Sequence, residues 1–447
     1  MRFSWPFPAA GRRHQIIRLA TPIILGMVSI NIMDLVDTAM IGTLGDTALA
    51  ATGFASLLFF ASFSAYAGLS AGVQTLTARQ LGAHHTEEPG DPLYAGLFST
   101  VMYAAILSPA LYVFAPQILS LFTTDSVVFP MAVDYYRWRV VGMVCIGISI
   151  AYRGYWNGLK APNTYTIILV LTHCLNIFFN WLLIFGNLGF PELGLKGAAI
   201  GSTAALTIGA LFYIFYTGAK RPIHPKQTAL FTTPTLKRLL KLSLPTCLDN
   251  SLFAFNLVGL FWVFGQLGTT ATAIAHVVIT SVLILWLPGM GFGMASMSLV
   301  SEAMGKGDAR DAKQWAWDIN RLSTPIILAI GLFLFCFPTL ILSQFIHDPD
   351  TLSKAIFPFR LDTLTLWIVS IGNVFVESLK GVGATRVVML VNIVLRWGVL
   401  LPGAYIIGIT LGYGLNGIWI FWASTALLHS GIFLLIWQRE RWKSITV

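Results

Sequence analysis

The fold is decided by a stretch of sequence that occurs twice in the chain. Residues 19–51 read LATPIILGMVSINIMDLVDTAMIGTLGDTALAA, and residues 242–274 read LSLPTCLDNSLFAFNLVGLFWVFGQLGTTATAI. An offset of 223 residues aligns prolines and glycines of the two copies: Pro22 with Pro245, Gly42 with Gly265 and Gly45 with Gly268. The same offset pairs glycines far beyond these stretches: Gly68 with Gly291, Gly82 with Gly305 and Gly158 with Gly381. Matches at one offset across several segments indicate two homologous halves.

The composition places both halves in a membrane. Of the 447 residues, 56% are hydrophobic and 11% are charged, whereas soluble domains carry about 25% charged residues. About twelve apolar stretches reach the roughly 20 residues that a spanning helix needs: 16–42, 52–76, 94–118, 132–157, 164–186, 194–217, 239–265, 272–299, 316–343, 358–381, 386–409 and 414–437. Strands of a membrane barrel would instead alternate over about 10 residues. The sequence therefore predicts an all-α membrane protein with twelve transmembrane helices in two pseudo-symmetric six-helix bundles.

Six spans in each half mean that both halves enter the membrane from the same side. Parallel repeats of this kind are typical of secondary transporters, whose substrate site lies between the halves near the midplane. We expect an N-terminal lobe at 1–217, a cytoplasmic linker at 218–237 and a C-terminal lobe at 238–447. The linker is basic and interrupted by prolines, as a tether outside the membrane would be.

The excess of Lys and Arg behind the net charge of +9 indicates the membrane topology. If the N-terminus is cytoplasmic and the spans alternate, about 21 Lys and Arg fall inside and about 5 outside, in agreement with the positive-inside rule. We therefore expect a multi-pass protein of the inner (plasma) membrane with both termini in the cytoplasm. No nucleic-acid partner is expected, because there is no basic soluble domain. The four cysteines lack metal-ligand spacing, so no metal site is expected.

Two acids stand inside the first span, where a carboxylate costs roughly 2.5–3.5 kcal/mol at the bilayer centre. They are Asp34 and Asp37, and the second half carries Leu257 and Leu260 at the equivalent positions. The acids are therefore not needed to build this helix. Intramembrane acids are functional candidates by default, and two neighbouring acids can also titrate as a coupled pair.

The fifth span offers polar partners for these acids. His173, Asn176 and Asn180 follow i, i+3, i+7 spacing on one helix face. At about 1.5 Å rise per residue, Asn180 reaches the depth of Asp37, and Asn176 that of Asp34. An amide can donate to a carboxylate or accept from a protonated acid. The competing interpretation is that the amides only hold helices together, and for His173 we favour packing over proton relay.

Other intramembrane polar residues are weaker candidates. Asp249 and Glu377 lie near the cytoplasmic ends of their spans, so ion pairing is favoured, with Arg153 and Arg396 as possible partners. Tyr135 belongs to a polar group at the outer start of the fourth span, most of which we interpret as interfacial anchors. We keep Tyr135 among the candidates for coupling or substrate binding.

Three motifs resemble a known family. VDTAMIG at 36–42, its repeat after mid-chain, and NIFFNWLLIFG at 176–186 followed by GLKGAAIGS at 194–202 are similar to the multidrug and toxic compound extrusion (MATE) transporters. The resemblance covers nearly the whole chain and is greatest to the DinF-like branch. It implies two six-helix bundles, a central cavity, and antiport of organic, often cationic, compounds against protons or sodium.

The resemblance also assigns residues. The functional first-helix acid of the family falls on Asp37, and the fifth-helix asparagine of the branch falls on Asn176. Many relatives have an acid where this chain has Asn180, which removes one negative charge from a potential sodium site. Ser202 resembles a further hydroxyl ligand of the same pocket.

We therefore predict a secondary active multidrug exporter in the lipid bilayer, which antiports organic cations or amphipathic drugs against protons through protonation of Asp37. The alternatives are a sodium-coupled drug antiporter and a flippase of a lipid-linked precursor, which would need a cationic inner cavity. The chain lacks DDxxD, HExxH, GxSxG and P-loop motifs, so neither an enzyme nor an ATP-driven pump is expected. No cofactor is expected beyond the coupling ion, and the protein is expected to be a monomer.

Overall fold

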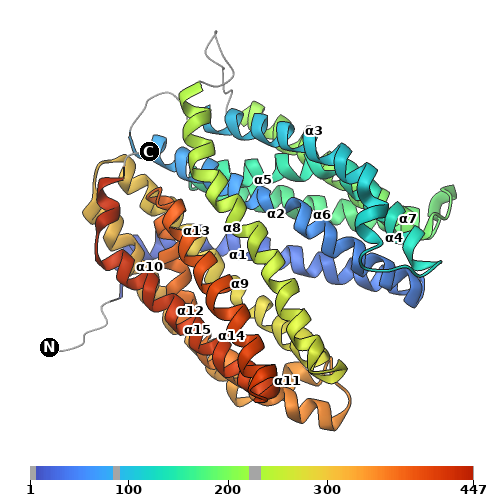
Figure 1. Ribbon diagram of the computed structural model, residues 1–447. Helices are drawn as coiled ribbons and strands as arrows, with labels where there is room; N and C mark the ends of the chain where they lie inside the picture. The colour runs from blue at the N-terminus through green and yellow to red at the C-terminus, as the bar shows by residue number, and fades with distance from the viewer. Residues whose placement is uncertain (1–6, 84–90, 221–232, 446–447) are drawn as a thin grey trace. The chain divides into compact units, whose positions relative to one another are not determined.

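The chain forms helices throughout the part that the computed structural model describes, residues 7–83, 91–220 and 233–445, and no strand occurs there. Eleven of these helices are long and apolar enough to cross a membrane. The remaining predicted span, the fourth in the chain, is broken at Gly142 into α4 (Val128–Val141) and α5 (Met143–Gly158). The predicted all-α architecture is confirmed (Figure 1).

The helices group into two compact units. One contains Met1–Ile24, Gly82–His84 and Leu248–Val447, and the other contains Leu25–Leu81 and His85–Cys247. The second of these, here called the first-lobe unit, holds most of the helices that precede residue 220: α2 (Asp46–Gly82), α3 (Asp91–Leu119), α4, α5, α6 (Pro162–Ile184), the short η1 (Asn187–Gly189) and α7 (Gly194–Lys220).

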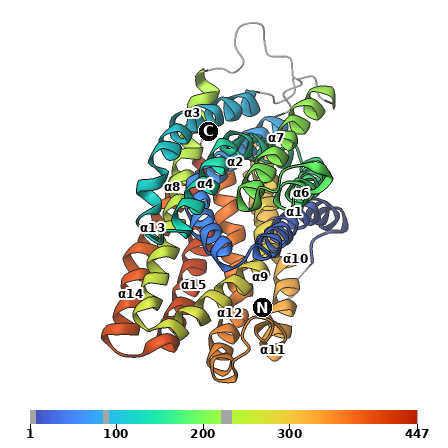
Figure 2. The same cartoon turned by 90° about the vertical axis from the view of Figure 1, so that its right-hand side faces the viewer.

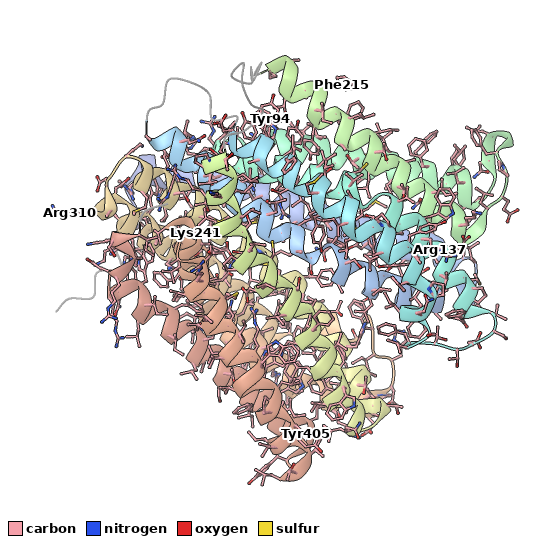
Figure 3. The ribbon with its side chains drawn as sticks, turned by 45° about the horizontal axis from the view of Figure 1, so that its top comes forward. Tyr94, Arg137, Phe215, Lys241, Arg310 and Tyr405 are labelled. Carbon is pink, nitrogen blue, oxygen red and sulfur yellow. The ribbon has the colours of Figure 1, made fainter. Side chains whose placement is uncertain are left out.

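The other unit, here called the second-lobe unit, is centred on α12 (Pro349–Gly381). Helices α9, α10 and α15 pack around α12 (Figure 2). Its elements are α9 (Thr269–Gly305), α10 (Ala309–Cys336), α11 (Thr339–Leu342), α12, α13 (Thr385–Ile393), η2 (Val394–Leu400), α14 (Leu401–Tyr405), η3 (Ile406–Thr410), α15 (Gly414–Gln438) and η4 (Arg441–Ser444). Arg310 and Tyr405 lie at opposite ends of this bundle (Figure 3).

Two helices are divided between the units. α1 (Ala10–Gly42) changes unit after Ile24, and α8 (Thr233–Gln266) changes unit after Cys247. Both changes fall two residues after a proline inside the helix, Pro22 and Pro245, which are equivalent in the repeat. A proline removes one backbone hydrogen bond and permits a bend.

The predicted division at 1–217, 218–237 and 238–447 follows the sequence repeat, whereas the compact units cut through the first helix of each half. Helices α7 and α8 reach into both ends of the predicted linker, and its middle, 221–232, lies outside the described residues.

Glycines of the repeat let these divided helices pack closely. A Cβ on Gly68 would lie 2.3 Å from the backbone nitrogen of Cys247, and a Cβ on Gly291 would lie 2.3 Å from Cγ1 of Ile24. The two contacts are related by the same offset of 223 residues. Small residues allow helix backbones to approach closely in membranes, so the matched glycines have a common packing role inside each unit.

The first turns of α1 are held on α10 by an arginine. Arg12 lies with Nη1 2.6 Å from Asp311 Oδ1 and Nε 2.6 Å from Asp318 Oδ2. Its guanidinium carbon lies 3.6 Å from the ring centroid of Trp315. The three partners stand at i, i+4 and i+7 and therefore share one face of α10. This cluster fixes the start of α1 within the second-lobe unit.

The eleventh span departs from regular α-helix. Residues 394–400 (η2) and 406–410 (η3) are π-helical on either side of α14. A π-helix is built on i→i+5 hydrogen bonds, and such turns occur frequently at functional sites. Here the Arg396 carbonyl accepts from the backbone N–H of Leu401 and also from Asn256 Nδ2 at 3.1 Å.

Candidate functional site

The central contact of the first-lobe unit joins α1 to α6. Asn180 Nδ2 donates to Asp37 Oδ1 at 2.7 Å and to Asn176 Oδ1 at 3.0 Å. Both asparagines are buried, and Asp37 is half-buried. Because one amide nitrogen bonds both oxygens, Asn176 orients the Asn180 amide toward the carboxylate. The structure thus brings together three of the residues singled out in the sequence.

The two acids of α1 have different surroundings. The Asp34 side chain is exposed on the protein surface, and within the described residues its carboxylate makes no hydrogen bond or ion pair. Its polar neighbours on the helix are bonded to their own backbone: Asn31 Nδ2 to the Met27 carbonyl at 3.0 Å and Thr38 Oγ1 to the Asp34 carbonyl at 2.7 Å. Of these two acids, Asp37 is the one that a direct hydrogen bond ties to the fifth span among the described contacts.

A glycine on α7 brings Ser202 close to this contact. A Cβ on Gly201 would lie 2.6 Å from Asn180 Oδ1, so only glycine lets α7 pack directly on the amide. Ser202 is the next residue and is buried, but in the described part of the chain its hydroxyl makes no hydrogen bond to Asp37, Asn176 or Asn180. Asn180 Oδ1 is itself buried and has no hydrogen-bond donor among the described residues.

Tyr135 on α4 lies close enough to interact electrostatically with Asp34, Asp37 and Arg139, and it forms a side-chain hydrogen bond with Ser56. Arg139 also acts electrostatically on both acids. Arg139 belongs to the polar group at the outer start of the fourth span, most of which the sequence led us to interpret as interfacial anchors. Its spacing of i+4 from Tyr135 places the two side chains on the same face of α4, which is the signal that could have identified it. The site therefore holds two carboxylates and one nearby cation.

His173, the third polar residue of α6, has a separate partner. Its Nδ1 lies 2.6 Å from Ser29 Oγ on α1. Both residues precede the contact between Asp37 and Asn180 by about two helical turns along their helices. The imidazole thus joins α1 to α6 at a second level, and a direct bond between His173 and Asp37 does not occur among the described contacts.

The ion pairs predicted near the cytoplasmic ends of other spans are partly present. Glu377 Oε1 lies 2.6 Å from Lys380 Nζ on the same helix. Arg153 Nε instead donates to Ser70 Oγ at 3.4 Å, within the first-lobe unit. Asp249 and Glu377 belong to the other compact unit, so a pairing of Arg153 with either of them stays a prediction.

Asp249 belongs to a buried network in the second-lobe unit. It accepts from Arg396 Nη1 at 3.0 Å and from Asn392 Nδ2 at 2.8 Å, and His429 Nε2 lies 2.9 Å from Asn392 Oδ1. The predicted pairing of Asp249 with Arg396 is confirmed. The sequence did not indicate Asn392 and His429, because they follow Asp249 by more than a hundred residues and stand singly in apolar helices.

These features define a class of protein. Two repeated bundles of apolar helices with an acid bonded inside a span are those of a multi-pass membrane transporter. The MatE family model matches the chain twice, over residues 22–182 and 245–406. The chain therefore belongs to the MatE family of transporters, and it is not an enzyme.

Named relatives match along almost the entire chain. A protein of Thermotoga maritima named "Probable multidrug resistance protein NorM" is 24% identical over 447 residues, covering 97% of this chain and 94% of that protein. A Synechocystis protein of the same name is 26% identical over 436 residues, covering 93% and 92%. The solved outward-facing conformation of a multidrug resistance MATE family transporter has a TM-score of 0.88 at 20% identity, covering 96% and 95%, and shows the same fold.

Proposed function

We propose that this protein exports organic cations in exchange for protons, and that Asp37 is the residue that takes up the proton. The relatives named multidrug resistance protein support drug export. The observation that carries the assignment of Asp37 is its 2.7 Å hydrogen bond from Asn180. The orientation with both termini in the cytoplasm of the inner membrane is part of the same proposal.

Protonation of Asp37 changes the free energy that this hydrogen bond contributes. A hydrogen bond to a charged group contributes about 1.5–3 kcal/mol, and one between neutral groups about 0.5–1.5 kcal/mol. Protonation of Asp37 therefore weakens its link to Asn180 by about 1 kcal/mol. The new O–H also needs an acceptor, and the buried Oδ1 of Asn180 has no donor among the described residues. Turning the amide to accept that proton breaks its bond to Asn176, so the contact between α1 and α6 rearranges.

The charges of the site favour a cation as substrate. Asp34 and Asp37 face one nearby cation, Arg139, so a single positive charge on the ligand balances the site when both acids are ionised. A proton on Asp37 removes the negative charge that holds the ligand. Substrate and proton thus compete for one carboxylate, as an antiporter requires. Each proton that moves down 100 mV supplies about 2.3 kcal/mol.

Sodium coupling is the second candidate, and one observation favours it. The unpartnered Asn180 Oδ1, the Asn176 amide oxygen and the Asp37 carboxylate are oxygen ligands of the kind that bind hard cations. Position 180 carries an asparagine and not an acid, so only one carboxylate is bonded in this group. A single carboxylate supports the proton, and not the sodium ion, as the coupling ion.

Ethidium accumulation by inside-out vesicles tests the proposal. Wild type, Asp37→Asn and the matched variant Asp34→Asn are compared under an acid-inside proton gradient without sodium, and under a sodium gradient without a pH difference. We expect proton-driven accumulation that Asp37→Asn abolishes and Asp34→Asn only reduces. Accumulation driven by sodium alone would refute proton coupling, and full proton-driven export by Asp37→Asn would refute the role of Asp37.

A further inference from the structure

Lysine and arginine side chains gather near the point where α15 ends, in the second-lobe unit. They are Arg310, Lys313, Arg439, Arg441 and Lys443. Glu440 binds both Lys313 of α10 and Lys443 of η4, so these two parts of the chain meet at one carboxylate. Arg310 stands three residues before Lys313 and therefore lies beside it on the surface of α10. Five cations around this one acid make the surface strongly positive.

The segment after α15 is folded back on that helix. Glu440 adopts a left-handed backbone conformation with a φ of 55°, which is uncommon for residues other than glycine and turns the chain after the last turn of α15. Trp442 is 2% exposed, and its indole N–H donates to the Trp437 carbonyl at 3.0 Å. The two indole rings are stacked, with their centroids 4.3 Å apart. The ion pairs of Glu440 and the buried indole therefore hold η4, and the cations that it carries, in one position.

Two of the arginines are free to bind a ligand. Arg439 and Arg441 are exposed, and within the described residues neither guanidinium makes a hydrogen bond or an ion pair. Cations can also stabilise the last carbonyls of a helix, but in the described part of the chain these two side chains make no such contact. The acids on the neighbouring turn of α10 are occupied, because Asp308 caps that helix and Asp311 binds Arg12. An anion from outside the chain could therefore balance both guanidinium groups.

The face of α15 that leads to these arginines is apolar and uncovered. Leu428 and Leu435, here called the leucine stripe, lie inside the span and are 50% and 54% exposed. Arg439 follows Leu435 by four residues, so it continues the same helix face just beyond the span. A Cβ on Gly431, between the two leucines, would meet no atom within 4 Å, so no other helix packs on this face at that level. An apolar stripe that ends at a cation matches the outline of a phospholipid with an anionic headgroup.

We propose that this surface binds an anionic phospholipid, with its phosphate at Arg439 and Arg441 and an acyl chain along the leucine stripe. Guanidinium groups bind phosphate oxygens through paired N–H donors, and clusters of Lys and Arg next to a spanning helix attract anionic lipids. A nucleic acid or an acidic peptide would use the cations alone and make no contact with the leucine stripe inside the bilayer. The proposal does not depend on drug export, on proton coupling or on which leaflet holds this end of α15.

Native mass spectrometry of the purified full-length protein in a non-ionic detergent tests the proposal. The probes are phosphatidylglycerol, phosphatidylcholine with the same acyl chains, and inorganic phosphate. The two lipids share their apolar part, and the phosphatidylglycerol headgroup alone carries a net negative charge. We expect phosphatidylglycerol to bind about tenfold more tightly than phosphatidylcholine, the scale of the attraction of one or two cations for an anionic lipid. Inorganic phosphate in large excess should not displace the lipid, because it makes no contact with the leucine stripe.

Charge-matched variants assign the binding to this surface. Arg439→Gln combined with Arg441→Gln should abolish the roughly tenfold preference for phosphatidylglycerol, whereas Arg439→Lys combined with Arg441→Lys should keep most of it. The control is Lys354→Gln combined with Arg360→Gln, which removes two exposed cations from the opposite end of the same unit. Arg360 donates to the Phe335 carbonyl near the end of α10, far along that helix from Lys313. This control should bind both lipids as the wild type does.

The proposal is overturned if the folded wild-type protein binds the two lipids equally, or if the glutamine double variant keeps the full preference. An equal loss in the control would assign the preference to overall charge, and displacement by inorganic phosphate would assign it to a free anion, so either result refutes a lipid site here. If the glutamine double variant does not fold, Arg439→Gln and Arg441→Gln are measured singly, and each should reduce the preference. Failure of ethidium transport in vesicles, by contrast, would refute the proposed function and leave these affinities unaffected.

Discussion

Replacing Gly68 by alanine tests the packing that the repeat imposes. The new Cβ would lie 2.3 Å from the Cys247 backbone nitrogen, and real Cβ atoms keep at least 3.0 Å. The backbones of α2 and α8 must therefore separate by at least about 0.7 Å, since a backbone atom cannot rotate away. Overpacking of this kind costs about 1–3 kcal/mol, and the gain from replacing glycine in a helix is about 1 kcal/mol. We expect a net loss of up to about 2 kcal/mol.

Two matched variants isolate the cause. A Cβ on Gly53, also in α2, would meet no atom within 4 Å, so Gly53→Ala should be neutral or stabilising by up to about 1 kcal/mol. A Cβ on Gly291, the repeat equivalent of Gly68, would meet first the side chain of Ile24, which can change rotamer. Gly291→Ala should therefore cost less than Gly68→Ala.

The assay is the apparent thermal unfolding temperature of the purified proteins in one detergent, with ethidium export in vesicles as a second measurement. The expected order of stability is Gly53→Ala, Gly291→Ala and then Gly68→Ala. Equal stability of the Gly53 and Gly68 variants would show that α2 does not press on α8 as the structure indicates. Gly291→Ala less stable than Gly68→Ala would refute the distinction between a backbone and a side-chain obstacle.

Three further predictions concern charged residues. Arg12→Gln leaves Asp318, whose side chain is 2% exposed, without its nearest cation, so it should lower the free energy of unfolding by more than about 1 kcal/mol, and differential scanning fluorimetry can measure the change. Contacts with Lys313, followed by Lys443, lower the pKa of Glu440 to about 2. The stabilisation from these contacts should be complete above the ordinary glutamate pKa and be lost as the pH falls through about 2, which a pH titration of unfolding temperature can follow. Arg139→Gln removes the cation beside two carboxylates, so it should lower the KM for ethidium severalfold.

Each of these has its own control. Arg13 is exposed, so Arg13→Gln should leave the unfolding temperature unchanged, and an equal effect of both arginine variants would contradict the role of the cluster on α10. For the contacts of Glu440 after the end of α15, Glu440→Gln should remove the difference in unfolding temperature between pH 5 and pH 3. If the difference persists in this variant, it arises from other groups. For the site, Arg137→Gln should leave the KM unchanged, because Arg137 contacts Tyr112 instead. An unchanged KM in Arg139→Gln would show that this cation does not act on the substrate.

The sequence alone determined the features that depend on local composition and on the repeat. The lengths of the apolar stretches predicted the spanning segments, because a helix must cross about 30 Å of hydrocarbon with all its backbone hydrogen bonds satisfied. Helical spacing placed Asn180 at the depth of Asp37, and the two side chains are in contact at 2.7 Å. The repeat identified Gly68 and Gly291, whose equivalent packing follows from one offset.

Tertiary structure decided what depends on residues far apart in the chain. The broken span at Gly142, the π-helical turn at Arg396 and the change of unit after Ile24 have no signature in local periodicity. A cavity among α8, α9, α12, η2 and α15 needs five elements, of which the first begins at Thr233 and the last at Gly414. Arg139 reaches the acids only because α4 packs near α1. Spacing along one helix fixes which side chains share a face, whereas the free energy of packing between helices fixes which faces meet.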